Sequence, residues 1–368
     1  MTRTSPEDTS VKVHRSPADA LRELPEPTEP LLVIVPDSTR PIDLKSALHA
    51  VQLWSGGRVS AVHVGLGLHR RSTESELSVL RKACSWTVFD HDPDDCVELG
   101  ALDGAPIEVS RAVGEAKRIL TIGRIELHQY AGFSGGYKGV VVGCGGRSLI
   151  EALHDRQMVT QPGVRVGELT DNPFRTLIDR IGQQLPSTTA LQWLPDHGWM
   201  AGDPSKVLAV AAKISKAFFP SPKPVDRVLV DLPNSKAVNF YQASRGATYL
   251  ALSPRPPLFP GAQIVLEAAC PEGIGLGSGE ANFANALRSC PPPWTPLLTE
   301  PIAFGGGSQR AVMLALLAQK YRLVVTGCSN PSPLLELGVE AYKESASERF
   351  GTFELVVTNP FQQLPQLV

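Results

Sequence analysis

The first part of the chain alternates short apolar runs with segments whose apolar residues recur at helical spacing. The run Leu31–Pro36 is typical of a strand that is buried on both faces, and Asp43–Trp54 has the pattern of an amphipathic helix. Val59–Val64 and Glu74–Ala83 repeat this pair. Strands that alternate with helices in this way predict an α/β fold with a mostly parallel sheet.

The same alternation continues to residue 154 and begins again after a proline-rich segment. Ile119–Ile122 is predicted to be a strand and Ser148–His154 a helix. Pro220–Pro224 has no periodicity, which predicts a linker. The β-α series that follows it comprises Arg227–Asp231, Lys236–Leu252, Gln263–Ala269, Gln309–Lys320 and Arg322–Thr326.

A chain of 368 residues is too long for one ordinary core. We therefore expect two α/β domains with mostly parallel sheets and an active-site cleft between them. The N-terminal domain would span residues 1–222 and the C-terminal domain residues 223–368, with the last residues able to return to the first domain.

The composition is that of a soluble globular protein, with 42% apolar and 20% charged residues. A formal net charge of −2 gives no general attraction to nucleic acid or to an anionic membrane. The N-terminal 30 residues lack an apolar core and no long apolar run follows, so neither a signal peptide nor a membrane span is expected. Six scattered cysteines favour reduced thiols in a cytoplasmic protein over a cysteine-built zinc site.

Polar motifs follow the first two predicted strands. The carboxyl ends of parallel strands face the ligand crevice of an open sheet, so Asp37 and Arg40 after the first strand and His69 after the second point to one site. Arg40 could fork onto a carboxylate or phosphate, and Asp37 could orient a histidine. The alternatives are a helix cap or Asx turn for the first motif and a surface histidine for the second. Arg70 replaces the last glycine of a dinucleotide fingerprint.

The stretch from His128 to Lys138 carries a third group, which His154 completes. Gly135 and Gly136 allow a tight turn before the lysine. A lysine amine can form a covalent bond, and histidines supply metal ligands and proton transfer near neutral pH. Together they suggest a covalently tethered, metal-containing cofactor. The alternative is a glycine-rich turn with a solvated lysine, and phosphate-loop spacing is absent.

Two motifs of the second domain carry polar groups. Tyr241, Gln242 and Arg245 recur at near-helical spacing and could present polar groups to the cleft, as a substrate site. An ordinary capped helix with a polar face explains them equally well. The loop Gly273–Gly279 alternates glycines, which suits either an anion-binding loop or a plain connection.

Taken in order, the motifs resemble the nickel-dependent lactate racemase family, whose members racemise or epimerise 2-hydroxy acids with a nickel-pincer nucleotide. The resemblance covers most of the chain. It rests on Asp37-x-Thr-Arg-Pro41, His69-Arg70, the segment His128-x-x-Ala-Gly-Phe-Ser-Gly-Gly-x-Lys138, and His154 at the family's spacing from the lysine.

The resemblance implies a role for each group. Lys138 would carry the nickel-pincer nucleotide through a thioamide bond, and His154 would ligate nickel beside the cofactor's sulfur and carbon donors. His69 and His128 would be the two acid/base residues, while hydride passes reversibly between substrate and cofactor. The nucleotide of the cofactor would be bound by Asp37, Ser38, Thr39 and Arg40. The substrate would be bound by Arg40, Tyr241, Gln242 and Arg245.

Some positions depart from the family pattern. Arg245 stands where the family has a lysine, Arg71 where the lactate enzyme has a proline, and no tryptophan lies near Gly305–Arg310. The substrate is therefore open among lactate, malate and similar acids. The implied partners are a small 2-hydroxy acid and the proteins that make the cofactor, with no nucleic acid or membrane. The alternatives are a zinc hydrolase with three histidines (His69, His128 and His154) and a non-catalytic small-molecule-binding protein.

Overall fold

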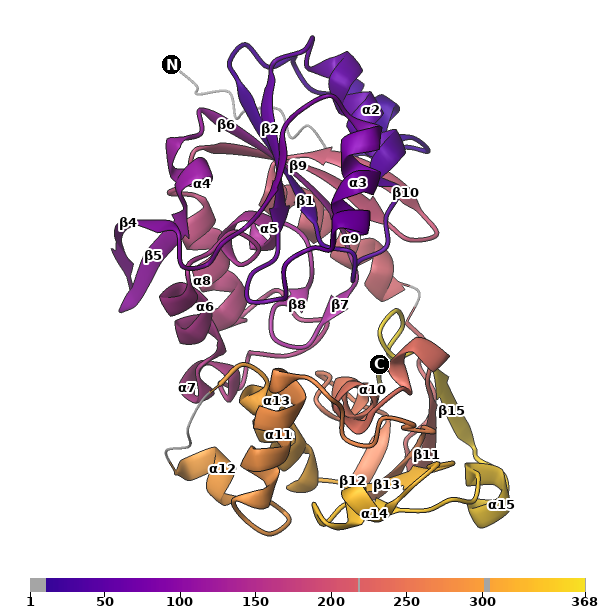
Figure 1. Cartoon of the computed structure of the whole chain (residues 1–368). Coiled ribbons are helices and arrows are strands. Elements are labelled where there is room, and N and C mark those ends of the chain that lie inside the picture. Colours follow the sequence, from indigo (N-terminus) through magenta and orange to yellow (C-terminus); the bar gives the residue numbers. More distant parts are fainter. Residues whose placement is uncertain (1–10, 218, 301–304, 368) are drawn as a thin grey trace, which may run out of the picture. The chain divides into compact units, whose positions relative to one another are not determined.

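The computed structural model of the protein describes residues 11–217, 219–300 and 305–367. These residues pack into two compact units, each with its own sheet (Figure 1). Of the described residues, 11–126, 134–151 and 176–213 belong to unit 1. Unit 2 comprises 127–133, 152–175 and those from 214 onward.

The sheet of unit 1 has six strands in the order β10-β9-β6-β1-β2-β3. All neighbours are parallel except the β9–β10 pair, which is an antiparallel hairpin. The strands are β1 (Leu31–Pro36), β2 (Val59–Gly65), β3 (Val88–Asp90), β6 (Arg118–Arg124), β9 (Ser187–Leu194) and β10 (Gly198–Gly202). Continuous apolar runs form the central strands because helices and loops cover both faces.

The helices that cover this sheet begin at capping residues that the sequence supplies. The side chain of Asp43 caps α2 (Leu44–Trp54), and Thr73 with Glu76 forms a capping box on α3 (Glu74–Ala83). These two helices pack against each other beside the sheet (Figure 1). The other helices that lie wholly in unit 1 are α1 (Pro17–Arg22), α4 (Arg111–Glu115) and α5 (Lys138–Val141).

Three further helices have their two ends in different units. They are α6 (Arg147–His154), α8 (Pro173–Gly182) and α9 (Pro204–Ala217). Two hairpins complete this part of the chain: β4 (Cys96–Leu102) with β5 (Ala105–Ser110) in unit 1, and β7 (Leu127–His128) with β8 (Gly132–Phe133) in unit 2.

The sheet of unit 2 is entirely parallel, in the order β14-β13-β12-β11-β15. Its strands are β11 (Val225–Asp231), β12 (Leu258–Glu267), β13 (Arg322–Thr326), β14 (Glu340–Ala341) and β15 (Leu355–Thr358). Its helices are α7 (Arg156–Val159), η1 (Asn234–Lys236), α10 (Phe240–Ala251), α11 (Ser278–Arg288), α12 (Pro296–Thr299), α13 (Ser308–Ala318), α14 (Ser332–Leu335) and α15 (Ala346–Phe350). Helix α13 packs against both α10 and α11.

The α/β fold with mostly parallel sheets is confirmed. The grouping of the chain differs from a single division at residue 222, because 127–133 and 152–175 pack with the C-terminal residues. The domain boundaries themselves stay a prediction. All six cysteines are free thiols. Over the described residues, no helix has the length and apolarity needed to cross a membrane.

Candidate functional site

Unit 1 brings Asp37 and His69 together at the carboxyl ends of β1 and β2. The Nδ1 atom of His69 lies 2.5 Å from Oδ2 of Asp37, and the other carboxylate oxygen accepts hydrogen bonds from Thr39. Burial raises the pKa of Asp37. The hydrogen bond and charge of His69 and the hydrogen bonds of Thr39 outweigh this effect of burial and bring the pKa to about 2. The ionised carboxylate orients the ring, which leaves Nε2 of His69 as the nitrogen that can take a proton.

The rest of the first motif is bound to acidic side chains. Arg40 forms an ion pair with Glu126, and both side chains are largely buried. The hydroxyl of Ser38 donates to Glu76 at 2.6 Å, and Arg70 holds the same carboxylate through two N–H groups at 2.8 and 2.9 Å. A phosphate or carboxylate ligand that binds Arg40 or Ser38 would therefore displace the carboxylate of Glu126 or Glu76.

Lys138 is the first residue of α5, which packs against β1 and β6. Gly135 and Gly136 precede it with φ values of 91° and 60°, a backbone conformation that favours glycine. A Cβ at Gly139 would collide with the hydroxyl of Thr121 on β6. These three glycines therefore set the half-buried lysine close to the strands of unit 1.

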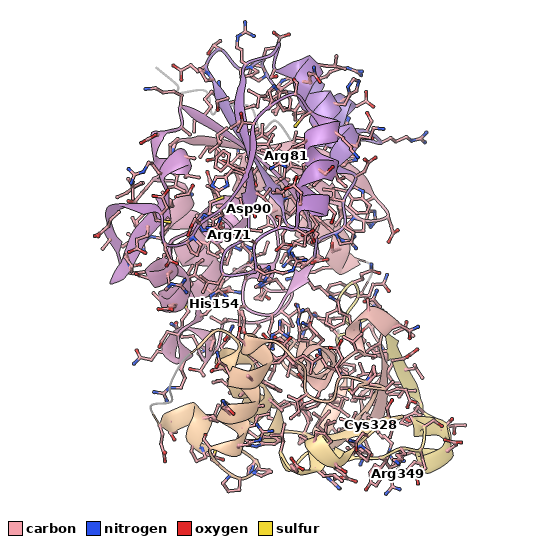
Figure 2. All side chains as sticks on the ribbon, viewed as in Figure 1. Arg71, Arg81, Asp90, His154, Cys328 and Arg349 are labelled. Atoms are coloured by element: carbon pink, nitrogen blue, oxygen red, sulfur yellow. The ribbon has the colours of Figure 1, made fainter. Side chains whose placement is uncertain are left out.

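Unit 2 gathers His128 and His154 around the ring of Tyr130. The centres of the rings of Tyr130 and His154 are 5.5 Å apart and meet edge to face, and those of Tyr130 and His128 are 5.9 Å apart. Figure 2 labels His154, which ends α6. The Nδ1 atom of His128 accepts the N–H of Ala131 at 3.1 Å. A neutral His128 ring therefore carries its proton on Nε2, the reverse of the arrangement at His69.

Two residues that the sequence reading missed hold the loop of His128 in place. Asn172, which is fully buried, donates its amide to the carbonyl oxygens of Tyr130 and Glu168 at 2.8 and 2.9 Å. The guanidinium of Arg175 donates to the carbonyl oxygens of Ala131 and Phe133. No motif marks them, because they lie more than forty residues from Tyr130, Ala131 and Phe133, whose carbonyl oxygens they bind.

The predicted substrate residues of α10 lie in unit 2, where the side chain of Asn239 caps the helix. Arg245 donates to the hydroxyl of Tyr249 at 3.1 Å and to Gln242 at 3.4 Å. A second arginine, Arg310 of α13, stacks on Tyr241. In the sequence, the segment of Arg310 is marked only by its lack of tryptophan.

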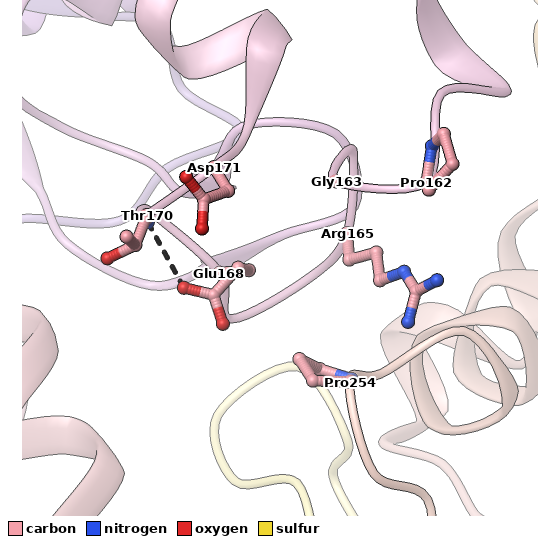
Figure 3. A pocket seen from close by; sticks show the side chains of 7 residues that line it. All are labelled: Pro162, Gly163, Arg165, Glu168, Thr170, Asp171 and Pro254. Atoms are coloured by element: carbon pink, nitrogen blue, oxygen red, sulfur yellow. Dashed lines mark hydrogen bonds between the residues drawn. The ribbon is translucent and has the colours of Figure 1, made fainter.

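A separate pocket of about 250 Å³ opens in unit 2 among loop residues (Figure 3). Arg165, Glu168 and Asp171 are among its lining residues, and none of the predicted site residues lines it. Across the described part of the chain, no group of three or more His, Cys, Asp or Glu side chains is placed to hold a metal ion.

The architecture and motifs agree with known proteins. Residues 9–167 match the family model of the lactate racemase N-terminal domain. The lactate racemase of Thermoanaerobacterium thermosaccharolyticum is 29% identical over 165 residues, and that of Lactiplantibacillus plantarum 28% over 166 residues. Each alignment covers 42% of this chain and 39% of the relative, so it spans about two fifths of the curated protein.

Solved structures show the same fold over the whole chain. The lactate racemase apoprotein of T. thermosaccharolyticum superposes with a TM-score of 0.81 at 18% identity, covering 100% of this chain and 97% of that one. A protein of Thermotoga maritima gives a TM-score of 0.70 at 15% identity, covering 96% and 97%. The fold is thus one that lactate racemase apoprotein shares. The match over residues 9–167 confirms, for this part of the chain, the resemblance to lactate racemases that its motifs carry.

Proposed function

We propose that the protein is a racemase or epimerase of 2-hydroxy acids. The observation that carries this proposal is that each of two histidines, His69 and His128, has its Nδ1 atom held by another group. Asp37 holds Nδ1 of His69 and the N–H of Ala131 holds Nδ1 of His128, which leaves Nε2 of each ring for proton exchange with a substrate. Inversion of a 2-hydroxy acid needs one group to remove the hydroxyl proton and another to return it.

The residues fit the nickel-pincer nucleotide, which the family resemblance implies. Such a cofactor brings its own sulfur and carbon donors and needs one imidazole, and His154 supplies one among the rings of Tyr130 and Phe174. Lys138 would attach the cofactor covalently, and Asp37 to Arg40 would bind its nucleotide. When bound, the cofactor would supply a reversible hydride acceptor for C2.

The chain's own groups supply the remaining steps. Arg40, Gln242 and Arg245 would bind the substrate carboxylate and orient C2. His69 would take the hydroxyl proton as C2 becomes planar, and a protonated His128 would give a proton back when the opposite face is reduced. His69 would then release its proton to water, and His128 would take one up. In the reverse direction, the two histidines exchange these roles, as an imidazole can near neutral pH.

The test is to purify the holoenzyme from a host that makes the cofactor and to measure its metal content, intact mass and racemisation of a panel of 2-hydroxy acids. We expect nickel, an added mass at Lys138, and loss of both mass and activity in Lys138→Ala. Lys82→Ala, at an exposed lysine of α3, is the matched control and should retain both.

Other outcomes would decide against the proposal. Zinc without added mass would favour the hydrolase. A protein that carries the adduct but racemises no acid of the panel would overturn the racemase and favour a binding protein.

A further inference from the structure

Arg310 of unit 2 is a cation that stacks on a tyrosine. Its guanidinium carbon lies 3.8 Å from the centre of the Tyr241 ring, and one N–H group donates to the carbonyl oxygen of Tyr241 at 3.2 Å. Among the described residues, no carboxylate forms an ion pair with Arg310. Burial lowers its pKa to about 10, and the charge of Arg245 acts in the same direction. A partly buried cation of this kind is stabilised by an anion.

A second guanidinium lies near enough to repel the first. Arg245 faces the rings of Tyr249 and Phe361, at 5.6 and 5.5 Å from their centres. The two arginines come from different helices, α10 and α13, which pack against each other. Two like charges held near each other by packed helices attract an anion. The structure thus concentrates positive charge at this point of unit 2.

The hydroxyl of Tyr130 adds an unused hydrogen-bonding group. Tyr130 is 6% exposed, and its hydroxyl has no hydrogen-bond partner among the described residues. The charges of Arg310 and Arg245 both act on this hydroxyl. A buried hydroxyl without a partner is costly, which indicates a ligand atom at this position. The ring of Tyr130 also contacts His128 and His154, so the cationic group lies beside two predicted site residues.

We propose that Arg310 and the Tyr130 hydroxyl bind a second carboxylate, and that the substrate is a 2-hydroxy dicarboxylic acid such as malate. The planar guanidinium of Arg310 spends one N–H on Tyr241 and keeps other donors for a bidentate carboxylate. Arg245 and Gln242 remain for the carboxylate next to C2. A methyl group in this place, as in lactate, leaves the desolvated guanidinium unpaired.

This inference rests on the proposed racemase, and the test separates the two. The holoenzyme is assayed with malate and with lactate, and malate, lactate and inorganic phosphate are titrated calorimetrically. We expect kcat/KM and affinity to favour malate by at least about tenfold. Arg310→Met keeps the apolar stem on Tyr241 and should lower both for malate by about 30-fold, with little change for lactate.

Two further variants provide controls. Arg310→Lys keeps the charge without the fork and should fall between wild type and Arg310→Met. Arg349→Met removes another arginine that stacks on a tyrosine of unit 2, Tyr342, and should leave the preference for malate unchanged (Figure 2).

Lactate turnover equal to that of malate, with no change of the ratio in Arg310→Met, would overturn the dicarboxylate site and leave the racemase standing. Phosphate binding as tight as malate would also overturn it, because the site would then be a general anion site. If neither acid is racemised, the proposed function fails, and the calorimetric difference between malate and lactate still decides the role of Arg310.

Discussion

His69 and Asp37 lie 2.5 Å apart, between Nδ1 and Oδ2, although 32 residues separate them along the chain. They meet because β1 and β2 are parallel neighbours and both residues follow the carboxyl end of a strand. The carboxylate fixes which ring nitrogen of His69 carries the proton. The carboxylate therefore holds the His69 ring in one orientation, in contrast to a histidine that is only exposed.

Asp37→Asn should lower kcat for racemisation about 100-fold while the fold is retained. The amide no longer holds the Nδ1 proton, so the ring loses its orientation and its preferred tautomer. Asp43→Asn is the matched control, because asparagine caps α2 as well as aspartate does. Steady-state rates in both directions check this prediction, and equal rates in the two variants would contradict it.

The buried side chain of His63 should make the stability of the fold sensitive to acid. It is 1% exposed, with Nε2 2.9 Å from the hydroxyl of Ser110, and burial, helped by the charge of the buried His91, lowers its pKa from 6.5 to about 4. Between these values the unfolded chain binds a proton that the folded chain does not, so stability falls as pH falls through this window. The loss should reach about 3 kcal/mol at its lower end.

Urea unfolding followed from about pH 7 to about pH 4 measures this loss. His63→Gln keeps a group that can hydrogen-bond to Ser110 but does not titrate, so its profile should be flatter. His49→Gln, at an exposed position of α2, should keep the slope of the wild type. If the unfolding free energy of His63→Gln falls with pH as steeply as that of the wild type, the buried histidine is not the cause of the acid sensitivity.

Gly132 and Gly351 share a φ of 74° but differ in their surroundings. A Cβ at Gly132 would overlap the carbonyl oxygen of Glu168, whereas nothing lies within 4 Å of a Cβ at Gly351. Gly351→Ala should cost about 2 kcal/mol for backbone strain alone, because its φ of 74° and ψ of −134° lie outside the left-handed helical region. Gly132→Ala should cost about 3 kcal/mol or more, because the loop of His128 must also move. Unfolding free energies of the two variants test the difference, and equal costs would refute the close approach.

Asn172→Ser should destabilise unit 2 by about 3 kcal/mol, because the buried carbonyl groups of Tyr130 and Glu168 lose their donor. Serine still caps α8, so the change isolates the amide. Asn282→Ser removes an amide that also donates to a backbone carbonyl, at the more exposed Gly306, and should cost less than about 1 kcal/mol. The urea midpoints of both variants give the comparison.

Much of the fold could be predicted because local signals and tertiary packing agree. The strand Leu31–Pro36 and the helix Glu74–Ala83 have the bounds that their patterns predict. The hairpin of β4 and β5 was missed because most of β4 is exposed and lacks a regular alternation of buried and exposed residues. The periodicity of apolar residues alone does not reveal such a strand.

Part of the candidate site could likewise be predicted from the sequence, and part could not. The meeting of Asp37 and His69 could be predicted from strand topology. Tyr130 and Arg310 could not, because a buried hydroxyl and a stacked guanidinium result from the packing of α13 and distant loops. A single sequence records which residues are present, but not which of two distant helices brings an arginine to a tyrosine.

Unit 2 is assembled from three separate stretches of the chain. During synthesis, the stretches at 127–133 and 152–175 leave the ribosome well before β11, and β11 must wait for its neighbour β15 near the end of the chain. His128 and His154 therefore spend much of translation without their final surroundings. A fragment that starts at residue 223 would lack both histidines, so this unit cannot be recovered by cutting the chain once.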